Sequence, residues 1–313
     1  SASGAGNTVT LADAGTATGF SQVENYILSS AGPNTFTVGA TAQNVTGGSA
    51  ADTVNIINSA SGTIDLGAGS NIINIANTFN ISAATIAATS GTYALNFTDA
   101  TSSITVSAAQ LTGANSVTES SDGPKTVSLS DALTSYTVDA DIDIINLANA
   151  VNDITLVNGS QQVIGGSAAD TITSAGGAIN LSTGAGADTL KFTQDQLAAA
   201  TVSGGTESDT VIITAASTAI VDADFTNFTT VEVLQLNGAS TAVLGTEAQQ
   251  AGFSTIVTGD GNTDLTIGGF PVTIDASAMD AADTLTIRGS GAITISGLVA
   301  QLTSYATGAL TIS

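Results

Sequence analysis

The sequence predicts an all-β protein, and within that class a parallel β-solenoid: a β-roll-like stack of short strands joined by Gly/Asp-rich turns. Three observations support this. Runs of four to seven residues that alternate apolar and polar side chains recur along the chain, and helical periodicity is scarce. Similar loops also return every 18–21 residues, a length that suits one coil of two or three short strands with tight turns. Tandem β-sandwich domains are the alternative; they account for the strands but not for the recurring loops.

The predicted strands are rich in Val, Ile, Leu and Thr, and each is bounded by Gly, Asn, Asp or Ser. In chain order they are residues 7–11, 34–38, 52–57, 62–66, 71–75, 102–106, 125–129, 153–157, 177–181, 209–213, 230–236, 263–267, 271–274, 283–287 and 291–295. Three stretches suit one or two turns of helix, namely 107–114, 193–200 and 298–306. Thr-x-Thr stretches such as "TFT" and "TLT" are not expected to recur in register over several coils, so the β-propensity of Thr accounts for them.

A longer repeat also appears, because residues 23–53 parallel residues 142–171 and a looser copy covers 230–269. We therefore expect residues 1–313 to form one continuous repetitive β-domain. Its repeat-like sections are about 20–75, 138–213 and 222–296.

The composition excludes most catalytic chemistry. The chain has no Cys, His or Trp and only three basic residues, and its formal net charge is −23. Thiol nucleophiles, disulfides, zinc sites of the usual ligand types and Ser-His-Asp triads are therefore excluded, and we expect no enzymatic activity. The negative charge argues against nucleic acid and anionic membranes as partners, and no apolar run is long enough to span a membrane. Hard metal cations are the natural counter-charge.

Loops rich in Gly and Asp precede several of the predicted strands. They read "GGSAADTVN" at 47–55, "GGSAADTIT" at 165–173, "TGAGADTLK" at 183–191 and "GGTESDTVI" at 204–212, and "LGAGSNIIN" at 66–74 has Asn in place of Asp. These loops resemble the nonapeptide GGxGxDxUx, with U apolar, of the hemolysin-type (RTX) calcium-binding repeat proteins. The resemblance covers about 47–75 and 165–213.

The resemblance implies that Ca²⁺ is bound at these loops, by the Asp carboxylate and by carbonyl groups that the Gly residues expose. The metal-binding residues that it implies are Asp188, Asp170, Asp209, Asp52, Gly184, Gly186, Gly165 and Gly166. Independently of any family, Ca²⁺ prefers six to eight oxygen ligands, and a Gly-rich turn with a carboxylate offers several of them from few residues.

Two features depart from the family pattern. The third Gly is replaced in most of the loops, and a recognisable loop occurs only about once per coil, since the opposite turn at 174–178 has no carboxylate. A simpler interpretation stays open: the loops are only tight turns, in which Asp caps the following strand through its own backbone bonds.

The composition, the repeats and the resemblance together imply a structural role. We expect an S-layer, surface filament or repeat segment of a large exported bacterial protein, located at the cell surface or outside the cell and sent out by type I secretion. An adhesin or carbohydrate-binding module is the alternative; it would expose clustered aromatic side chains, whereas the four tyrosines are scattered along the sequence: Tyr26, Tyr93, Tyr136 and Tyr305. A β-helix polysaccharide lyase or hydrolase generally needs a basic residue at its site, and the three basic residues are isolated: Lys125, Lys191 and Arg288.

The expected partners are copies of the same chain or neighbouring repeats in a lattice or filament. The segments "GNTVTL" and "GALTIS" near the two ends both read as strands able to pair with a further strand. Divalent cations should promote this pairing by bridging acidic loops. Cell-surface polysaccharide is a second expected partner.

Overall fold

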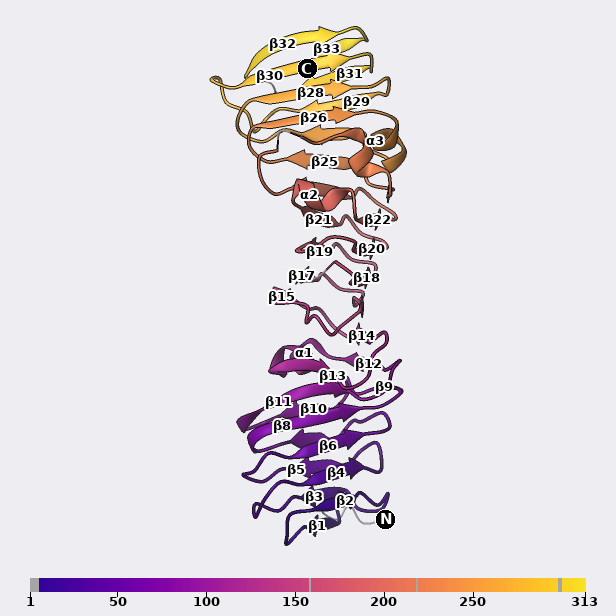
Figure 1. The fold of residues 1–313 in the computed structure, drawn as a ribbon, viewed down its shortest axis with the longest axis vertical. Coiled ribbons are helices and arrows are strands. Elements are labelled where there is room, and N and C mark those ends of the chain that lie inside the picture. The colour runs from indigo at the N-terminus through magenta and orange to yellow at the C-terminus, as the bar shows by residue number, and fades with distance from the viewer. Residues whose placement is uncertain (1–5, 158, 218, 298–299) are drawn as a thin grey trace. The chain divides into compact units, whose positions relative to one another are not determined.

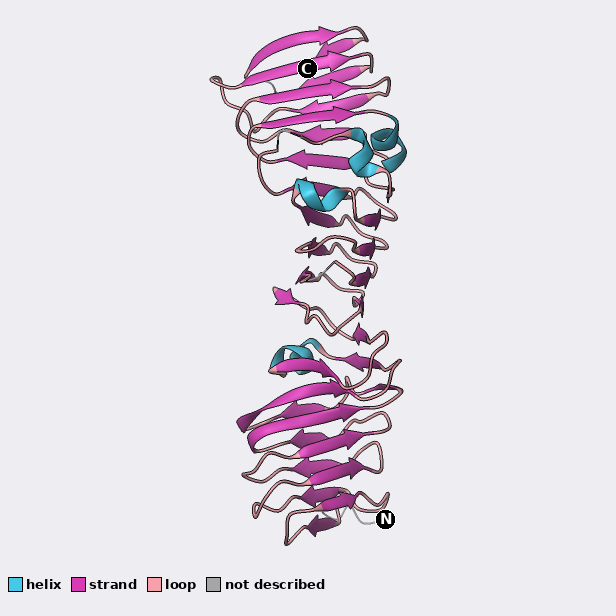
Figure 2. Cartoon of the chain, in the orientation of Figure 1, coloured by secondary structure: helices cyan, strands magenta, loops and turns pink. Residues whose placement is uncertain are grey.

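The computed structural model describes residues 6–157, 159–217, 219–297 and 300–313. This part of the chain is nearly all β-structure, and every strand pair found in it is parallel. Three short α-helices and one 3-10 helix are the only helical elements among the described residues (Figure 2). The prediction of a parallel β-solenoid is confirmed, and the β-sandwich alternative is wrong.

The chain divides into two compact units, and the first consists of Ser1–Leu133 and Asp139–Ala148. One of its sheets contains, in spatial order, β1 (Thr8–Thr10), β3 (Asn25–Ile27), β5 (Asn44–Thr46), β7 (Thr63–Asp65) and β10 (Thr85–Ala87). A second contains β2 (Thr16–Thr18), β4 (Thr35–Val38), β6 (Thr53–Ile56), β8 (Ala68–Ile75), β11 (Ser90–Phe97) and β13 (Ser116–Glu119). The remaining strands pair in the order β9 (Thr78–Asn80), β12 (Ser103–Val106), β14 (Thr126–Leu129) and β16 (Ile144–Asn146), and the unit has one helix, α1 (Ala108–Gly113).

The second unit consists of Thr134–Val138 and Asn149–Ser313. Its ten-stranded sheet contains β15 (Tyr136–Thr137), β17 (Asp153–Thr155), β19 (Thr171–Thr173), β21 (Thr189–Phe192), β23 (Thr210–Ile213), β25 (Val233–Leu236), β27 (Thr255–Val257), β29 (Val272–Asp275), β31 (Ile293–Ser296) and β33 (Leu310–Ile312). A second row contains β18 (Gln162–Ile164), β20 (Asn180–Ser182), β22 (Thr201–Ser203) and β24 (Phe228–Thr229). A four-stranded sheet contains β26 (Ser240–Leu244), β28 (Thr263–Ile267), β30 (Thr284–Gly289) and β32 (Gln301–Ala306). The helices are α2 (Gln194–Leu197), η1 (Asp222–Phe225) and α3 (Thr246–Ala251).

Within each unit the coils follow one another in chain order, so that neighbours in a sheet are generally alternate strands of the sequence (Figure 1). Ile172 of β19 pairs with Leu190 of β21, and Leu190 pairs in turn with Val211 of β23. This register follows from the side-chain period of two, because a slip of one residue would turn each buried apolar side chain to the outside. Both units are built from coils of this kind. It stays a prediction that residues 1–313 form a single repetitive domain with sections at 20–75, 138–213 and 222–296.

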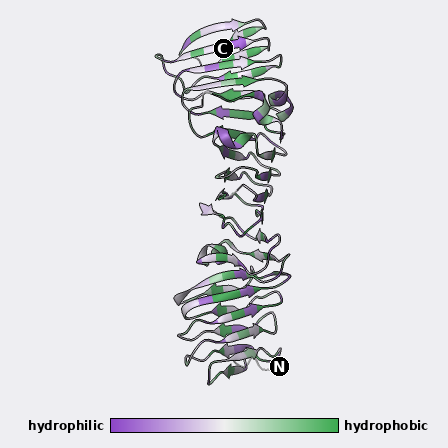
Figure 3. Ribbon diagram, viewed as in Figure 1, coloured by the Kyte–Doolittle hydropathy of each residue, from purple (hydrophilic) through white to green (hydrophobic). Residues whose placement is uncertain are grey.

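The core lies inside the coils and is filled by the buried apolar side chains of most strands. Hydrophobic and hydrophilic residues alternate along many of these strands (Figure 3). Val54, Ile73 and Leu95 form one row of the core in the first unit, and all three are 0% exposed. In the second unit the Phe225 ring meets Phe228 and Phe253 edge-on, at centroid distances of 5.5 and 4.9 Å. These rings fill the space beneath η1 and α3, two helices that the apolar pattern of the sequence does not predict.

One local prediction is wrong. The stretch 298–306 is not a helix where the structure describes it, since Gln301–Ala306 is strand β32 and pairs with β30; residues 298–299 lie outside the described residues. The Thr-x-Thr stretches do not recur in register over several coils, as predicted, since Thr35 and Thr37 of β4 pair with Thr16 and Thr18 of β2 but with Thr53 and Asn55 of β6. Single threonines do recur, because one outward position of the ten-stranded sheet carries Thr on seven strands: Thr171, Thr189, Thr210, Thr255, Thr273, Thr294 and Thr311. The unequal loop lengths hide this register in the sequence.

Lys125 is a buried cation in the first unit, directly before β14. Its side chain is 0% exposed and lies 3.0 Å from a carboxylate oxygen of Glu119. The ammonium group also donates to the carbonyl oxygens of Ser121 at 2.6 Å and Gly123 at 2.5 Å. It therefore neutralises a turn in which several oxygen atoms converge.

Replacing this cation should destabilise the first unit strongly. We expect Lys125→Met to lower the free energy of unfolding by about 3 kcal/mol, because the carbonyl oxygens and Glu119 lose a buried charged partner. Denaturant unfolding measures this. The control is Lys191→Met, whose side chain faces outward from β21 and whose effect should stay within about 0.5 kcal/mol. Equal stability of the two variants would contradict the role given to Lys125.

Candidate functional site

A ladder of Asp and Asn side chains runs along the largest sheet in each unit, at the start of successive strands; most of its members lie directly before a strand, and Asn71 lies inside β8. Its members are Asn34, Asp52 and Asn71 in the first unit and Asn152, Asp170, Asp188 and Asp209 in the second. We call this row the Asp/Asn ladder. Every member is buried, with at most 2% of its surface exposed.

The ladder continues the hydrogen bonding between coils into the turn. The Asp188 Oδ1 atom accepts the backbone N–H of Asp170 at 2.7 Å, and the Asp209 Oδ1 atom accepts the N–H of Asp188 at 2.8 Å. The Asp170 carbonyl accepts the N–H of Thr189 in the next coil at 2.8 Å. Each carboxylate thus replaces a backbone acceptor that the turn does not supply. The simpler interpretation holds that Asp caps the strand that follows it through backbone hydrogen bonds. The Asp carboxylates do accept backbone N–H groups, but these belong to the neighbouring coil.

Three consecutive carboxylates of the second unit keep an unused oxygen. The Oδ2 atoms of Asp170, Asp188 and Asp209 are buried and have no hydrogen-bond partner. Beside Asp188, the Thr183 hydroxyl donates to the carbonyl oxygen of Gly204 at 2.6 Å, and its closeness to the Asp188 carboxyl lowers the pKa of that group by less than burial raises it. A buried charged oxygen without a partner is costly, so these atoms call for either a proton or a cation.

The loop at 66–71 provides an internal comparison for the loop at 183–188. The two loops share the Gly-Ala-Gly sequence, and each has both of its glycines at positive φ: 70° and 90° in the first, 95° and 109° in Gly184 and Gly186. In the first loop the Asn71 Nδ2 group donates to the carbonyl oxygens of Ala68 at 3.2 Å and Gly69 at 3.3 Å. Asp188 stands at the same loop position with no hydrogen to donate. A carboxylate and backbone carbonyls are oxygen ligands of the kind that Ca²⁺ binds, so the residues fit this ion.

The pKa values of the ladder carboxyls are raised, as expected for buried carboxylates with an unpaired oxygen. Burial raises the pKa of Asp188 to about 6, and the negative charges of Asp170 and Glu207 add to the increase. Burial likewise raises the pKa of Asp209 to about 6, with further contributions from Asp188 and Glu232. The pKa of Asp170 is also raised by burial, against the opposing effect of its hydrogen bonds from Asn152. A group of mutually repelling acids holds protons tightly and would hold a divalent cation for the same reason.

The other residues predicted from the sequence have different surroundings. Asp52 uses both carboxylate oxygens, since Oδ1 accepts from the backbone N–H of Asn34 at 2.9 Å and Oδ2 accepts from the N–H of Gly48 at 3.0 Å. It therefore fits a cation less well than its counterparts in the second unit. Gly165 donates its N–H to Ser182 and Gly166 accepts from Ala185, so both take part in the bonding between coils.

Two acidic residues near the ladder were not predicted as members of the site. Glu232 extends the row by one coil, because its Oε2 atom accepts the N–H of Asp209 at 2.9 Å. Glu207 takes the place of the third Gly at a φ of 73°, and its carboxylate accepts the N–H of Gly186 at 2.9 Å, which holds its pKa below the usual value. The sequence signal for Glu232 is its 23-residue distance from Asp209, which is easily missed because the coil is longer than its neighbours.

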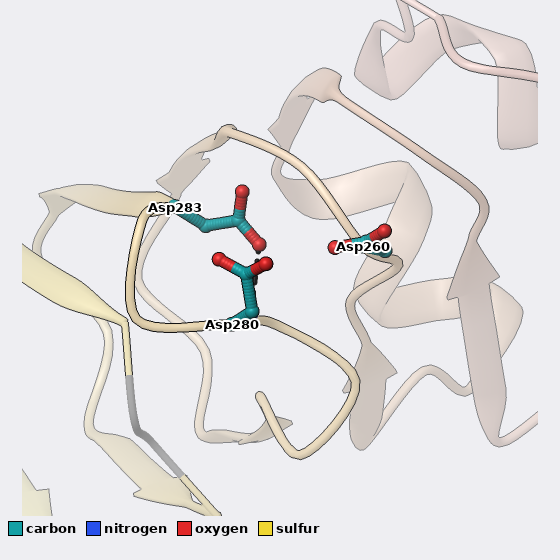
Figure 4. Close-up of side chains that lie close together, drawn as sticks. All are labelled: Asp260, Asp280 and Asp283. Carbon is teal, nitrogen blue, oxygen red and sulfur yellow. Dashed lines mark hydrogen bonds between the residues drawn. The ribbon is translucent and has the colours of Figure 1, made fainter.

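A separate acidic group lies in the second unit, and Figure 4 shows its side chains: Asp260, Asp280 and Asp283. Their carboxylate oxygens lie within 4.8 Å of one another, but the side chains are exposed or half-buried. Asp283 accepts the N–H of Asp280 at 2.8 Å and that of Gly261 at 3.1 Å, and these bonds lower its pKa. These contacts shape the loops, and the group lacks the buried unused oxygen of the ladder.

Comparisons with known proteins identify no relative. No protein-family model matches the chain, and no curated protein and no solved structure matches it significantly. No helix in the described part of the chain is long and apolar enough to cross a membrane.

The raised pKa values give a pH dependence that can be measured with a chelator present. Asp188 and Asp209 bind protons more tightly in the folded chain, at about pH 6, than unfolded, at the ordinary value of 3.8. The stability that they contribute is complete below about pH 4 and is lost as the pH rises through about 6. Denaturant unfolding of the wild type and of Asp188→Asn/Asp209→Asn should therefore diverge between about pH 4 and 6.5, with the variant favoured at the higher pH. Parallel pH profiles of the two proteins would contradict the raised values.

Proposed function

We propose that this chain is a structural segment of an assembly outside a bacterial cell, and that Ca²⁺ stabilises its second unit at Asp170, Asp188 and Asp209. The observation that carries the calcium part is the row of three buried Oδ2 atoms without partners. Asn71 shows what fills this place in the first unit, namely amide hydrogens that bond to the turn carbonyls. A bound cation would supply the positive charge that the carboxylates lack.

The RTX-type resemblance of the loops supports the wider setting. It favours an S-layer, surface filament or repeat segment of a large exported protein, released by type I secretion, and it favours binding and structural roles over catalysis. The parallel solenoid is compatible with such a role, because each coil contacts only its neighbours and the stack can be extended coil by coil.

Further coils are the natural partners of the sheet edges. Within the described residues, strands β33 and β32 each pair with one neighbouring strand. A strand at a sheet edge can pair with a strand from a neighbouring repeat or from a second copy of the chain. The net charge of −23 opposes association, and a divalent cation between acidic loops would reduce this repulsion.

Calcium should raise the melting temperature of the wild type by about 5 °C or more relative to chelator, because an ion that binds only the folded state stabilises it. Asp188→Asn should lose part of this increase. Asn is preferable to Ala, since its Oδ1 atom can still accept the Asp170 N–H, as Asn71 accepts the N–H of Asp52.

Asn71→Asp should gain calcium dependence in the first unit, because it removes the amide donor from a loop of the same shape.

Calorimetry in Ca²⁺, Mg²⁺ and chelator provides the measurement. Mg²⁺ should have a smaller effect, because it is smaller and demands octahedral geometry. Identical melting of the wild type in Ca²⁺ and chelator would refute the calcium proposal. An undiminished calcium effect in Asp188→Asn/Asp209→Asn would place the ion elsewhere.

Assembly is tested separately by light scattering at high protein concentration. We expect Ca²⁺ to increase the particle size, and NaCl at the same ionic strength to have a smaller effect because it screens charge without bridging acidic loops. Electron microscopy of the calcium sample should then show end-to-end association. A strictly monomeric protein in both conditions would remove self-assembly and leave only pairing with other repeats.

A further inference from the structure

The outward face of the four-stranded sheet in the second unit carries an aromatic ring, a guanidinium group and a carboxylate side by side. Arg288 of β30 is the register partner of Tyr305 of β32, and its guanidinium carbon lies 5.5 Å from the centre of the Tyr305 ring. The same guanidinium forms an ion pair with Asp264 of β28. Tyr305 is 63% exposed, and the side chains of Arg288 and Asp264 are 44% and 38% exposed. We call these three side chains the Tyr305 platform.

The four strands that carry the platform have no net charge. Asp264 and Arg288 are the only charged residues on the four strands of this sheet, and they neutralise each other, although the chain as a whole carries a charge of −23. Threonines flank the platform on the paired strands. Thr286 pairs with Asp264 on one side and with Thr303 on the other, and Thr266 pairs with Arg288. Hydroxyl groups thus surround a balanced ion pair and an exposed ring.

This combination matches the chemistry of a sugar ring. A pyranose has an apolar C–H face, which an exposed aromatic ring can cover, and a rim of hydroxyl groups that both donate and accept hydrogen bonds. Asp264 offers acceptors, Arg288 offers donors in a fixed planar arrangement, and the threonine hydroxyls offer both. Since the rest of the protein repels anions, an uncharged polymer suits this face better than an acidic one.

We propose that the Tyr305 platform is a binding site for a neutral polysaccharide, with a sugar ring stacked on Tyr305 and its hydroxyl groups bonded by Asp264 and Arg288. Arg288 lies within cation–π distance of the ring, and the exposure of Tyr305 leaves ring surface open to the ligand. The ion pair holds both charged groups in place before binding, which lowers the entropy lost when the ligand binds. The four tyrosines are scattered in the sequence, and this one acquires its polar neighbours only through the pairing of β30 with β32.

Affinity electrophoresis in native gels that contain dextran, mannan or hydroxyethyl cellulose tests this proposal, with polygalacturonate as the acidic contrast. We expect at least one neutral gel to retard the wild type and the acidic gel to leave its mobility unchanged. Tyr305→Ala should weaken binding about tenfold, whereas Tyr305→Phe keeps the ring and should bind nearly as well as the wild type. Asp264→Asn should also weaken binding, because a charged acceptor becomes neutral.

Two control variants separate this site from other effects. Phe20→Ala removes another exposed aromatic ring, 73% exposed in the first unit, and should leave retardation unchanged. Asp188→Asn should also bind like the wild type, so that failure of the calcium proposal would not affect this result. Circular dichroism confirms that each variant is folded, as expected for exposed positions. Absence of retardation in every neutral gel, retardation in polygalacturonate, or undiminished binding by Tyr305→Ala would each overturn the proposal.

Discussion

The parallel hydrogen bonding between successive coils is the interaction on which the structure depends, and its weakest point is the turn before each strand. There the backbone N–H of one coil faces a turn that offers no carbonyl acceptor. A short side chain with an acceptor oxygen completes the bond, as when the Asp188 carboxylate accepts the N–H of Asp170. The side chain must lie inside the stack to do so, which explains why some of the acids in this chain are buried although the solvent would stabilise their charge.

The two units neutralise their turns by different means. In the first unit the amide of Asn71 donates to turn carbonyls, and at another corner the ammonium group of Lys125 does the same from inside the protein. In the second unit the side chains of Asp170 and Asp188 carry no amide hydrogen of their own that could bond to the turn carbonyls, and their Oδ2 atoms stay unpaired. A protein-borne cation and a bound metal ion are two solutions to the same electrostatic problem, and the structure shows the first of them directly.

The fold could be predicted from the sequence because both of its signals are local. Alternating apolar residues located strands such as β23, predicted at 209–213, and the return of similar loops every 18–21 residues predicted that strands pair from coil to coil, as β21 pairs with β23. The site could be predicted only in part. That Asp188 bonds to the next coil, that Lys125 neutralises a turn and that Arg288 lies beside Tyr305 all depend on contacts between coils, which no short sequence window contains. Strand β32 was mistaken for a helix because the alternation of its apolar residues is too weak to identify a strand.

The likeness of the loops that contain Asn71 and Asp188 has a further consequence for the stack. When Asp replaces Asn, the Oδ1 acceptor and the glycine conformations stay the same. The exchange changes only whether the side chain itself supplies the hydrogens that bond to the turn carbonyls. Dependence on a cation can therefore differ from coil to coil without any change of fold. Because each coil of a solenoid contacts only its neighbours, an ion bound at Asp188 stabilises the coils next to it and leaves distant coils little affected. Local substitutions can thus decide which parts of such a stack depend on calcium.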